Sequence, residues 1–157
     1  MKIFPTKILN FQLVDNQDET LERLNRRTEK TDRLVSISTD KSFIGSVEGN
    51  RFMLISSAIG KGALCVMSGT IDEKKGQVKV EIHKVFRFLL GIFLIFPIIT
   101  FFVLLITKQE EFSLILILGI IVQILIIRYG FIELAFKLIS KDSLNRLRDV
   151  LDIEWRK

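Results

Sequence analysis

Residues 88–107 read FLLGIFLIFPIITFFVLLIT, and residues 112–127 read FSLILILGIIVQILII. Neither run contains a charged residue, and only KQEE (residues 108–111) separates them. An α-helix rises about 1.5 Å per residue and the hydrocarbon core of a bilayer is about 30 Å thick, so about 20 apolar residues span it. The first run has this length, and the second reaches it over 112–130 if the side chain of Arg128 extends toward the headgroups. Because the link is short, the sequence predicts an antiparallel transmembrane hairpin over residues 85–130.

Basic residues flank both sides of this hairpin. They are Lys79, Lys84 and Arg87 before the first span, and Arg128, Lys137 and Lys141 after the second. All of them except Lys141 are candidate contacts for lipid headgroups. Since Lys and Arg accumulate on the cytoplasmic side of a membrane, we expect a multi-pass protein of the bacterial inner membrane with both termini in the cytoplasm. The N-terminal sequence MKIFP lacks the apolar core of a signal peptide, in agreement with this orientation.

The composition restricts the chemistry that the chain is expected to perform. Of the 157 residues 48% are hydrophobic, and the net charge of +5 is spread along the sequence. This distribution favours contact with an anionic leaflet over binding of nucleic acid. One cysteine, Cys65, and one histidine, His83, exclude an internal disulfide and a metal site built mainly from these two residue types. We expect no cofactor.

The residues before the hairpin, 1–84, predict a cytoplasmic α+β domain. Residues 7–14 alternate in polarity as a half-buried strand does, and Asp15-Asn16 are placed to cap a helix with acidic residues in its first turns and basic residues in its last. Alternation of period two then recurs between turns, as in the Gly49-Asn50 turn. It predicts strands at 34–37, 43–48, 51–57, 63–71 and 77–83. We therefore expect an antiparallel β-meander with one helix packed against it.

After the hairpin, residues 131–157 predict an amphipathic helix at the membrane interface or in the cytoplasm. Charges enter the apolar pattern at helical spacing, and Ser140 or Asp142 is expected to cap the final helix. Its apolar face consists of Leu144, Leu147, Val150 and Leu151. This face needs a partner, which is the N-terminal domain, the membrane surface or another copy of the chain.

Taken in order, the chain has a strand and a helix, paired strands containing FIGSVEGNRF (43–52) and SGTI (68–71), and then a two-span hairpin. This pattern resembles small bacterial two-span membrane proteins with an N-terminal α+β domain. The resemblance covers most of the chain and depends on turn and packing residues. It implies no reaction and assigns no functional residue.

Three short motifs in the N-terminal region each allow a chemical and a structural interpretation. Gly60-Lys61-Gly62 shares its lysine and glycines with phosphate-binding loops, but the required earlier glycine and following Ser/Thr are missing, so a turn is favoured. Glu81 and His83 share a strand face and could form an acid–base pair. No motif places a nucleophile near them, so a solvated strand end near headgroups is favoured, with a minor hypothesis of pH-sensitive membrane contact. Cys65 is expected to be a buried thiol.

Three residues inside the predicted spans are candidates for helix–helix or oligomer contacts: Gln123, Thr100 and Pro97. An unpaired amide in hydrocarbon costs several kcal/mol, so Gln123 should face protein. Thr100 lies at comparable depth and is the expected partner within the hairpin; the alternative is that Gln123 lines an oligomeric interface or a pore. Pro97 is expected to kink the first span and free a backbone carbonyl.

Three classes of function follow from these patterns. The first is a non-catalytic membrane protein whose cytoplasmic domain binds a protein partner, a lipid headgroup or a small ligand, and whose hairpin anchors or oligomerises it. The second is a membrane-perturbing, pore-type effector or an immunity protein against a membrane-acting toxin. The third, a membrane-bound enzyme, is disfavoured because no set of residues fulfils the roles of an active site. We expect membrane lipid as a partner, with a homo-oligomer or an unknown protein as further partners.

Overall fold

The computed structural model describes residues 4–58, 62–107 and 114–156. The chain forms two compact units, one of Met1–His83 with Phe136–Lys157 and the other of Lys84–Ala135. The boundaries between these units lie after His83 and after Ala135, and from Phe136 onward the C-terminal segment belongs to the first unit.

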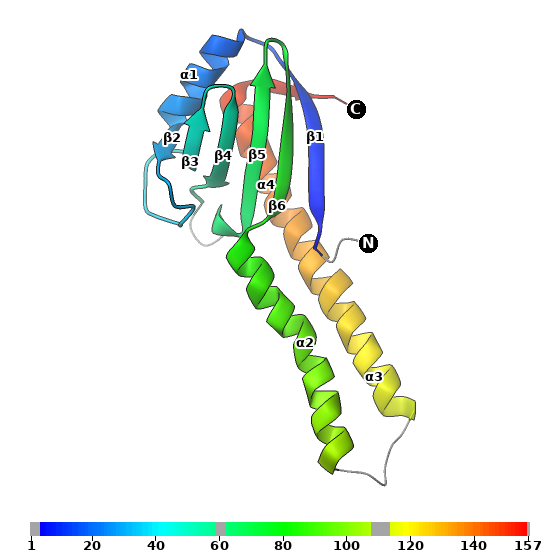
Figure 1. The fold of residues 1–157 in the computed structure, drawn as a ribbon. Helices are drawn as coiled ribbons and strands as arrows, with labels where there is room; N and C mark the ends of the chain where they lie inside the picture. The colour runs from blue at the N-terminus through cyan, green and yellow to red at the C-terminus, as the bar shows by residue number, and fades with distance from the viewer. Residues whose placement is uncertain (1–3, 59–61, 108–113, 157) are drawn as a thin grey trace. The chain divides into compact units, whose positions relative to one another are not determined.

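A seven-stranded sheet forms the first unit (Figure 1). Its strands are β1 (Thr6–Leu13), β2 (Thr28–Lys30), β3 (Phe43–Glu48), β4 (Arg51–Ser56), β5 (Cys65–Asp72), β6 (Lys75–Ile82) and β7 (Ile153–Trp155). Their spatial order is β2-β3-β4-β5-β6-β1-β7, and β2–β3 is a parallel pair whereas the others are antiparallel. The expected α+β class and the meander of β3 to β6 are confirmed.

Two-residue turns connect β3 to β4 and β5 to β6. Glu48 pairs with Arg51 across the first hairpin, so Gly49 and Asn50 form the turn that the sequence predicts. Gly49 has a φ of 56°, in the left-handed region that glycine adopts at no steric cost. The register set by these turns places alternate side chains of each strand on opposite faces of the sheet.

Two helices cover one face of the sheet, α1 (Gln17–Arg27) and α4 (Glu133–Leu151) (Figure 1). Leu24 of α1 is buried, as are the apolar residues Leu144, Leu147 and Leu151 of α4. Of the three partners expected for the apolar face of the C-terminal helix, the structure therefore supplies the first, the N-terminal domain. Burial of a large apolar side chain stabilises a fold by about 1.5–3 kcal/mol, so this face contributes substantially to the stability of the unit.

The start of α1 follows the sequence prediction in part. Asn16 is the N-cap residue, and the first and last turns carry acidic and basic residues as expected. However, the Asn16 side chain makes no capping hydrogen bond. Asp15 instead accepts a hydrogen bond of 2.6 Å from the guanidinium of Arg23, which ties the entry of the helix to its second turn.

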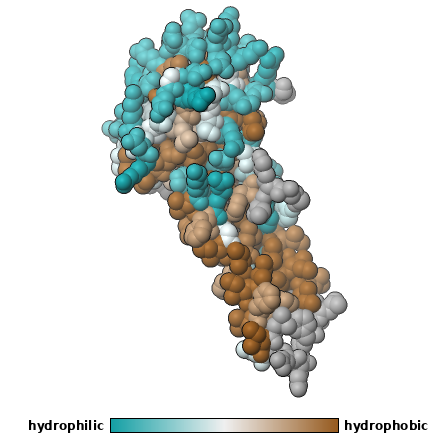
Figure 2. All heavy atoms as spheres, viewed as in Figure 1, coloured by the Kyte–Doolittle hydropathy of each residue, from teal (hydrophilic) through white to brown (hydrophobic). Residues whose placement is uncertain are grey.

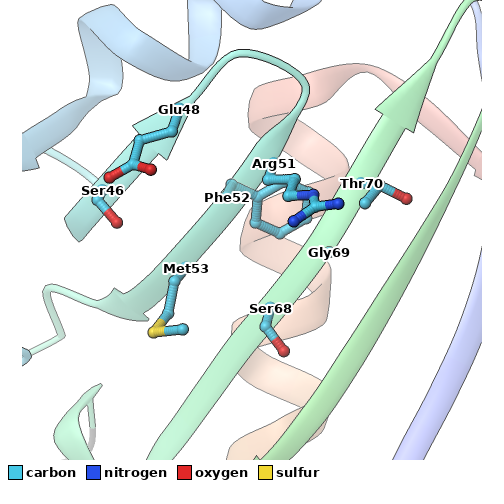
Figure 3. Close-up of a pocket in the computed structure, with 8 residues that line it drawn as sticks. All are labelled: Ser46, Glu48, Arg51, Phe52, Met53, Ser68, Gly69 and Thr70. Atoms are coloured by element: carbon cyan, nitrogen blue, oxygen red, sulfur yellow. The ribbon is translucent and has the colours of Figure 1, made fainter.

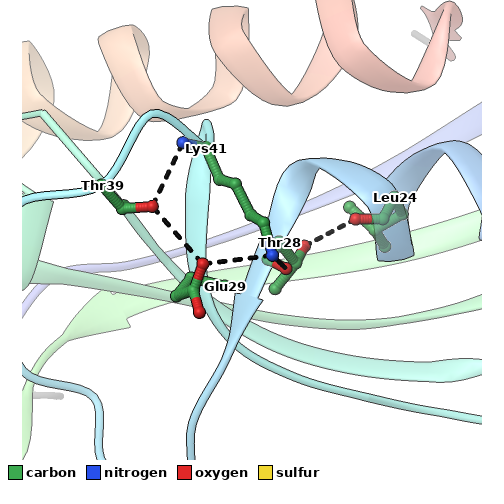
Figure 4. Close-up of polar contacts among 5 residues, drawn as sticks. All are labelled: Leu24, Thr28, Glu29, Thr39 and Lys41. Atoms are coloured by element: carbon green, nitrogen blue, oxygen red, sulfur yellow. Dashed lines mark hydrogen bonds and ion pairs between the residues drawn. The ribbon is translucent and has the colours of Figure 1, made fainter.

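The strand predicted at residues 34–37 is absent from the structure, and the edge strand is β2. The side chain of Leu34 packs on Ile44, Ile55 and Val66, on the face of the sheet opposite the helices, so burial of one residue rather than strand pairing holds this segment. Figure 4 shows a second anchor, in which the ammonium of Lys41 lies 3.1 Å from the Glu29 carboxylate and donates to the carbonyl of Thr28. The period-two pattern was misleading because Leu34 packs on the sheet without pairing, whereas Val35 and Ile37 are exposed.

The C-terminal segment differs from expectation in two further ways. The helix does not begin at Ser140 or Asp142, since α4 already begins at Glu133 and continues an earlier helical segment without a break. After Leu151 the chain turns at Asp152, whose φ is 52°, and forms β7. There Trp155 pairs with Phe11 of β1, with ring centroids 6.1 Å apart in an edge-to-face arrangement.

The second unit contains the two apolar runs of the sequence. They form α2 (Lys84–Thr107) and α3 (Leu114–Leu125), and a π-helical segment, η2 (Ile126–Ile132), follows α3. The link at 108–111 lies outside the described residues. Helix α2 begins two residues after β6 ends, so the chain passes from the sheet to the apolar helix without a linker.

Candidate functional site

The surface of α2 and α3 is apolar and exposed (Figure 2). Two helical segments, Lys84–Val103 and Ile117–Leu151, are long and apolar enough to cross a membrane, and only 6% of the most apolar window of each is buried. The core helix of a water-soluble domain has most of its apolar side chains buried. Exposed large hydrophobic residues on these helices include Phe88, Phe93, Phe96, Phe102, Leu118, Ile121, Val122 and Leu125.

The polar residues of these helices are not brought together. Thr100 is exposed, and its hydroxyl donates to the carbonyl oxygen of Phe96 in its own helix at 3.0 Å. Gln123 is exposed on α3, and within the described part of the chain no hydrogen bond joins it to Thr100. In this structure the two side chains are not joined to each other. Pro97, in contrast, is buried within α2, where its ring cannot donate the backbone hydrogen bond that the Phe93 carbonyl would otherwise accept.

The predicted headgroup contacts have different surroundings. In the second unit Lys84 is exposed and Arg87 is partly buried. Arg128, in η2, lies 3.5 Å from the carboxylate of Glu133 and has its guanidinium 5.2 Å from the ring centre of Tyr129. Such a partly neutralised arginine beside an aromatic ring is typical of the boundary between lipid and water.

The two remaining basic candidates belong to the first unit. Lys137 of α4 is exposed. Lys79 of β6 is engaged in an ion pair of 2.7 Å with Glu81 on the same strand. This contact also occupies the carboxylate that was considered as the acid–base partner of His83, and the proposed pair gains no support from it.

The other chemical motifs fall as follows. Gly60 and Lys61 of the Gly60-Lys61-Gly62 motif lie outside the described residues, and Gly62 opens a short 3₁₀ helix, η1 (Gly62–Leu64). Cys65 is fully buried in β5, and burial raises the pKa of its thiol to about 12, so it is protonated at neutral pH. Among the residues that the structure describes, no group of three His, Cys, Asp or Glu side chains is arranged to hold a metal ion.

A hollow of about 410 Å³ lies on the face of the sheet opposite α1 and α4 (Figure 3). We call it the sheet hollow. Its lining residues are Ser46, Glu48, Arg51, Phe52, Met53, Ser68, Gly69 and Thr70, from β3, β4 and β5. Two rows of paired residues cross it: Ser46, Met53 and Ser68 form one, and Glu48, Arg51 and Thr70 form the other.

The second row gives the sheet hollow its polar character. Glu48 and Arg51 are opposite each other in the register, and the hydroxyl-bearing Thr70 follows on the next strand. Within the described residues neither charged side chain takes part in an ion pair or a side-chain hydrogen bond. A ligand would therefore meet an accepting carboxylate, a five-donor guanidinium and hydroxyl groups in one shallow recess. Opposite charges and hydroxyl groups in one recess can bind a polar ligand.

Sequence reasoning missed the sheet hollow, although its residues stand in the sequence at alternate positions. Ser46 and Glu48, then Arg51 and Met53, carry the period-two signal of an outward face. What was missing is the register, which places these pairs and Ser68 side by side. The hollow becomes visible only once three strands are aligned.

Comparison with protein-family models, with curated proteins and with solved structures finds no match to this chain.

Proposed function

We propose that this chain is a non-catalytic integral membrane protein in which α2 and α3 cross the bilayer as a hairpin and the sheet unit binds a ligand in the cytoplasm. The observation that carries the proposal is the exposure of apolar side chains over both helices, together with the lack of any charge between Phe88 and Thr107. In water such a surface drives association, whereas in a bilayer it is satisfied by the lipid chains.

The orientation in this proposal follows from the flanking charges. Lys84 and Arg87 stand at the start of α2, and Arg128 stands after α3. If these basic residues lie on the cytoplasmic side of a bacterial inner membrane, both chain ends are in the cytoplasm. The same side chains are suited to contact anionic headgroups. Each basic residue near the membrane surface contributes about 1 kcal/mol of attraction to an anionic leaflet.

Membrane integration and topology are tested on the full chain in bacterial cells. Because Cys65 is buried, single cysteines introduced at Glu110 and at Glu73 serve as reporters for a membrane-impermeant maleimide. We expect the cysteine at position 110 to label in intact spheroplasts and the one at 73 only after permeabilisation. Release of the protein by alkaline carbonate, or equal labelling at both positions, would contradict the proposal.

For the sheet unit, we propose that the sheet hollow binds a polar ligand carrying hydrogen-bonding groups: a protein segment, a lipid headgroup or a small molecule. Support comes from Glu48 and Arg51, whose opposite charges face the recess beside Thr70. Charge-assisted hydrogen bonds are the stronger kind, so the loss of Arg51 should weaken binding most.

A photo-crosslinking residue placed at Met53 tests this binding in living cells. The matched control places it at Val14, which is also an exposed apolar residue of the sheet unit but lies outside the hollow. We expect an adduct at position 53 that the Arg51→Ala variant reduces, and its mass identifies the ligand class. Equal adducts at both positions, or an adduct indifferent to Arg51→Ala, would count against a site in the hollow.

One observation favours a second candidate, the pore-type effector. Gln123 is an exposed amide on an otherwise apolar helix, and pores present polar side chains at membrane depth. Release of a dye from vesicles that contain the purified chain would support this candidate, and intact vesicles at high protein-to-lipid ratio would remove it.

A further inference from the structure

Gln123 does not stand alone on α3. Positions 119, 122, 123 and 126 follow the spacing i, i+3, i+4, i+7 and therefore form one face of the helix, which we call the Gln123 face. All four residues are exposed, Val122 to 46% and Ile126 to 63%. Ile120, Ile124 and Ile127 lie on a different side and are more buried, so the Gln123 face points away from the packed side of the hairpin.

The amide of Gln123 needs a partner if α3 lies in a bilayer, and this step rests on the proposed function. Its side chain offers two donors and an acceptor, and lipid chains satisfy none of them. The polar group at comparable depth in the hairpin, the hydroxyl of Thr100, donates to the Phe96 carbonyl, and among the described residues the side chain of Gln123 makes no hydrogen bond. A partner from outside this hairpin would satisfy the amide.

We propose that a second copy of this chain covers the Gln123 face, so that two α3 helices pack across a two-fold axis parallel to the membrane normal. Two copies inserted in the same orientation place their Gln123 residues at the same depth. A primary amide is complementary to itself, because each of two facing groups donates to the carbonyl of the other. An isologous dimer thus satisfies both amides with one contact.

Gly119 makes a close approach of the two helices feasible. It precedes Gln123 by one turn on the same face, and a Cβ added there would meet no atom within 4 Å. The helix surface beside the amide is therefore open and carries no side chain at position 119. Small residues at such positions let transmembrane helices pack closely. Val122 and Ile126 flank the amide with exposed apolar surface that would pack against the second helix.

Self-association is measured with the full chain in lipid vesicles, by energy transfer between labelled copies as the protein is diluted with lipid. Removing one interhelical hydrogen-bonding side chain, in Gln123→Leu, should weaken association about three- to thirty-fold. Gly119→Leu should weaken it further by filling the approach. Two matched controls should leave it unchanged: Gly91→Leu, which also adds a side chain to open space on an apolar helix, and Thr100→Val, which removes a hydroxyl that bonds within α2.

Disulfide cross-linking then tests the geometry. Ile126→Cys, which lies on the Gln123 face and keeps the amide, should cross-link to a homodimer in native membranes, and Ile121→Cys, exposed on the opposite side of α3, should not. A ladder of higher oligomers, an adduct with a protein of different mass, or equal cross-linking at both positions would overturn the dimer. Carbonate extraction of the same samples separates the two proposals: a monomer that stays in the membrane refutes only the dimer, whereas a protein released from the membrane refutes the proposed function and the dimer with it.

Discussion

Phe11 of β1 and Gly76 of β6 are direct partners in the sheet, and the ring of Phe11 lies over the glycine. A Cβ at position 76 would overlap the Cζ and Cε2 atoms of this ring and would lie 2.7 Å from the carbonyl oxygen of Thr70. Phe11 is 1% exposed and also contacts Trp155 edge to face. Gly76→Ala therefore tests whether the first and last strands are held by one shared packing contact.

The magnitude follows from the two ways of accommodating the methyl group. If the ring stays, the strands must shift, and overpacking of this kind costs about 1–3 kcal/mol. If the ring tilts away, the edge-to-face contact of Phe11 with Trp155 is lost, about 0.5–1.5 kcal/mol, and Thr70 still clashes. Either way we expect Gly76→Ala to lower the free energy of unfolding by about 2 kcal/mol.

Trp155 provides the assay because it is the single tryptophan of the chain. Urea unfolding of the full chain in detergent is followed by its fluorescence for Gly76→Ala, Phe11→Leu and the double variant. We expect the double variant to be more stable than the sum of the single changes predicts, by about 1 kcal/mol, since the smaller side chain makes room for the methyl group. The control is Gly49→Ala, whose cost is conformational and should be additive with Phe11→Leu. Wild-type stability for Gly76→Ala, or strict additivity with Phe11→Leu, would refute the reasoning.

Four further outcomes follow from three single residues. With its pKa raised to about 12 from 9.0, Cys65 holds about a thousandfold less thiolate at pH 8 than an unfolded thiol, so iodoacetamide should modify it only after unfolding. Since its folded pKa is the higher one, its contribution to stability is complete below pH 9 and is lost as pH rises toward 12, which denaturant titration at alkaline pH measures. Arg146→Ala removes hydrogen bonds to the Ser42 carbonyl (3.5 Å) and the Ser57 hydroxyl (3.3 Å), and their length limits the expected loss to about 1 kcal/mol in the same fluorescence assay. Thr28→Val removes a buried hydroxyl that donates at 2.7 Å to the carbonyl one helical turn earlier, with an expected loss of about 1 kcal/mol, and a melting temperature equal to that of the wild type would show this bond to be dispensable.

Local signals in the sequence were sufficient for the meander and for the two apolar helices. The Gly49-Asn50 turn and the alternation on both sides of it define a hairpin within fourteen residues, and the apolar runs need only their length. Features that depend on residues far away in the sequence were not predicted. Leu34 packs on the far side of the sheet rather than in a strand, and β7 exists because β1, some 140 residues earlier, offers an open edge. No short-range pattern contains that information.

The candidate sites divide in the same way. Gln123 stands out in the sequence because an amide is unusual among isoleucines, but only the helix geometry shows that it points away from its neighbours. Glu48, Arg51 and Ser68 are ordinary surface residues until strand pairing assembles them. Thr100 was assigned to Gln123 on depth alone, and its own helix provides the nearer acceptor.

The division of the first unit into Met1–His83 and Phe136–Lys157 has a consequence for biosynthesis. A ribosome delivers β1 to β6 well before Leu144, Leu147 and Trp155, so while the apolar helices are made one face of the nascent sheet is covered by α1 alone and the edge at β1 is unpaired. The sheet can be completed only after the apolar helices have been synthesised. Completion of the first unit thus depends on residues made after both apolar helices. A chain that stops before Phe136 would expose the unpaired sheet edge that proteases and chaperones recognise.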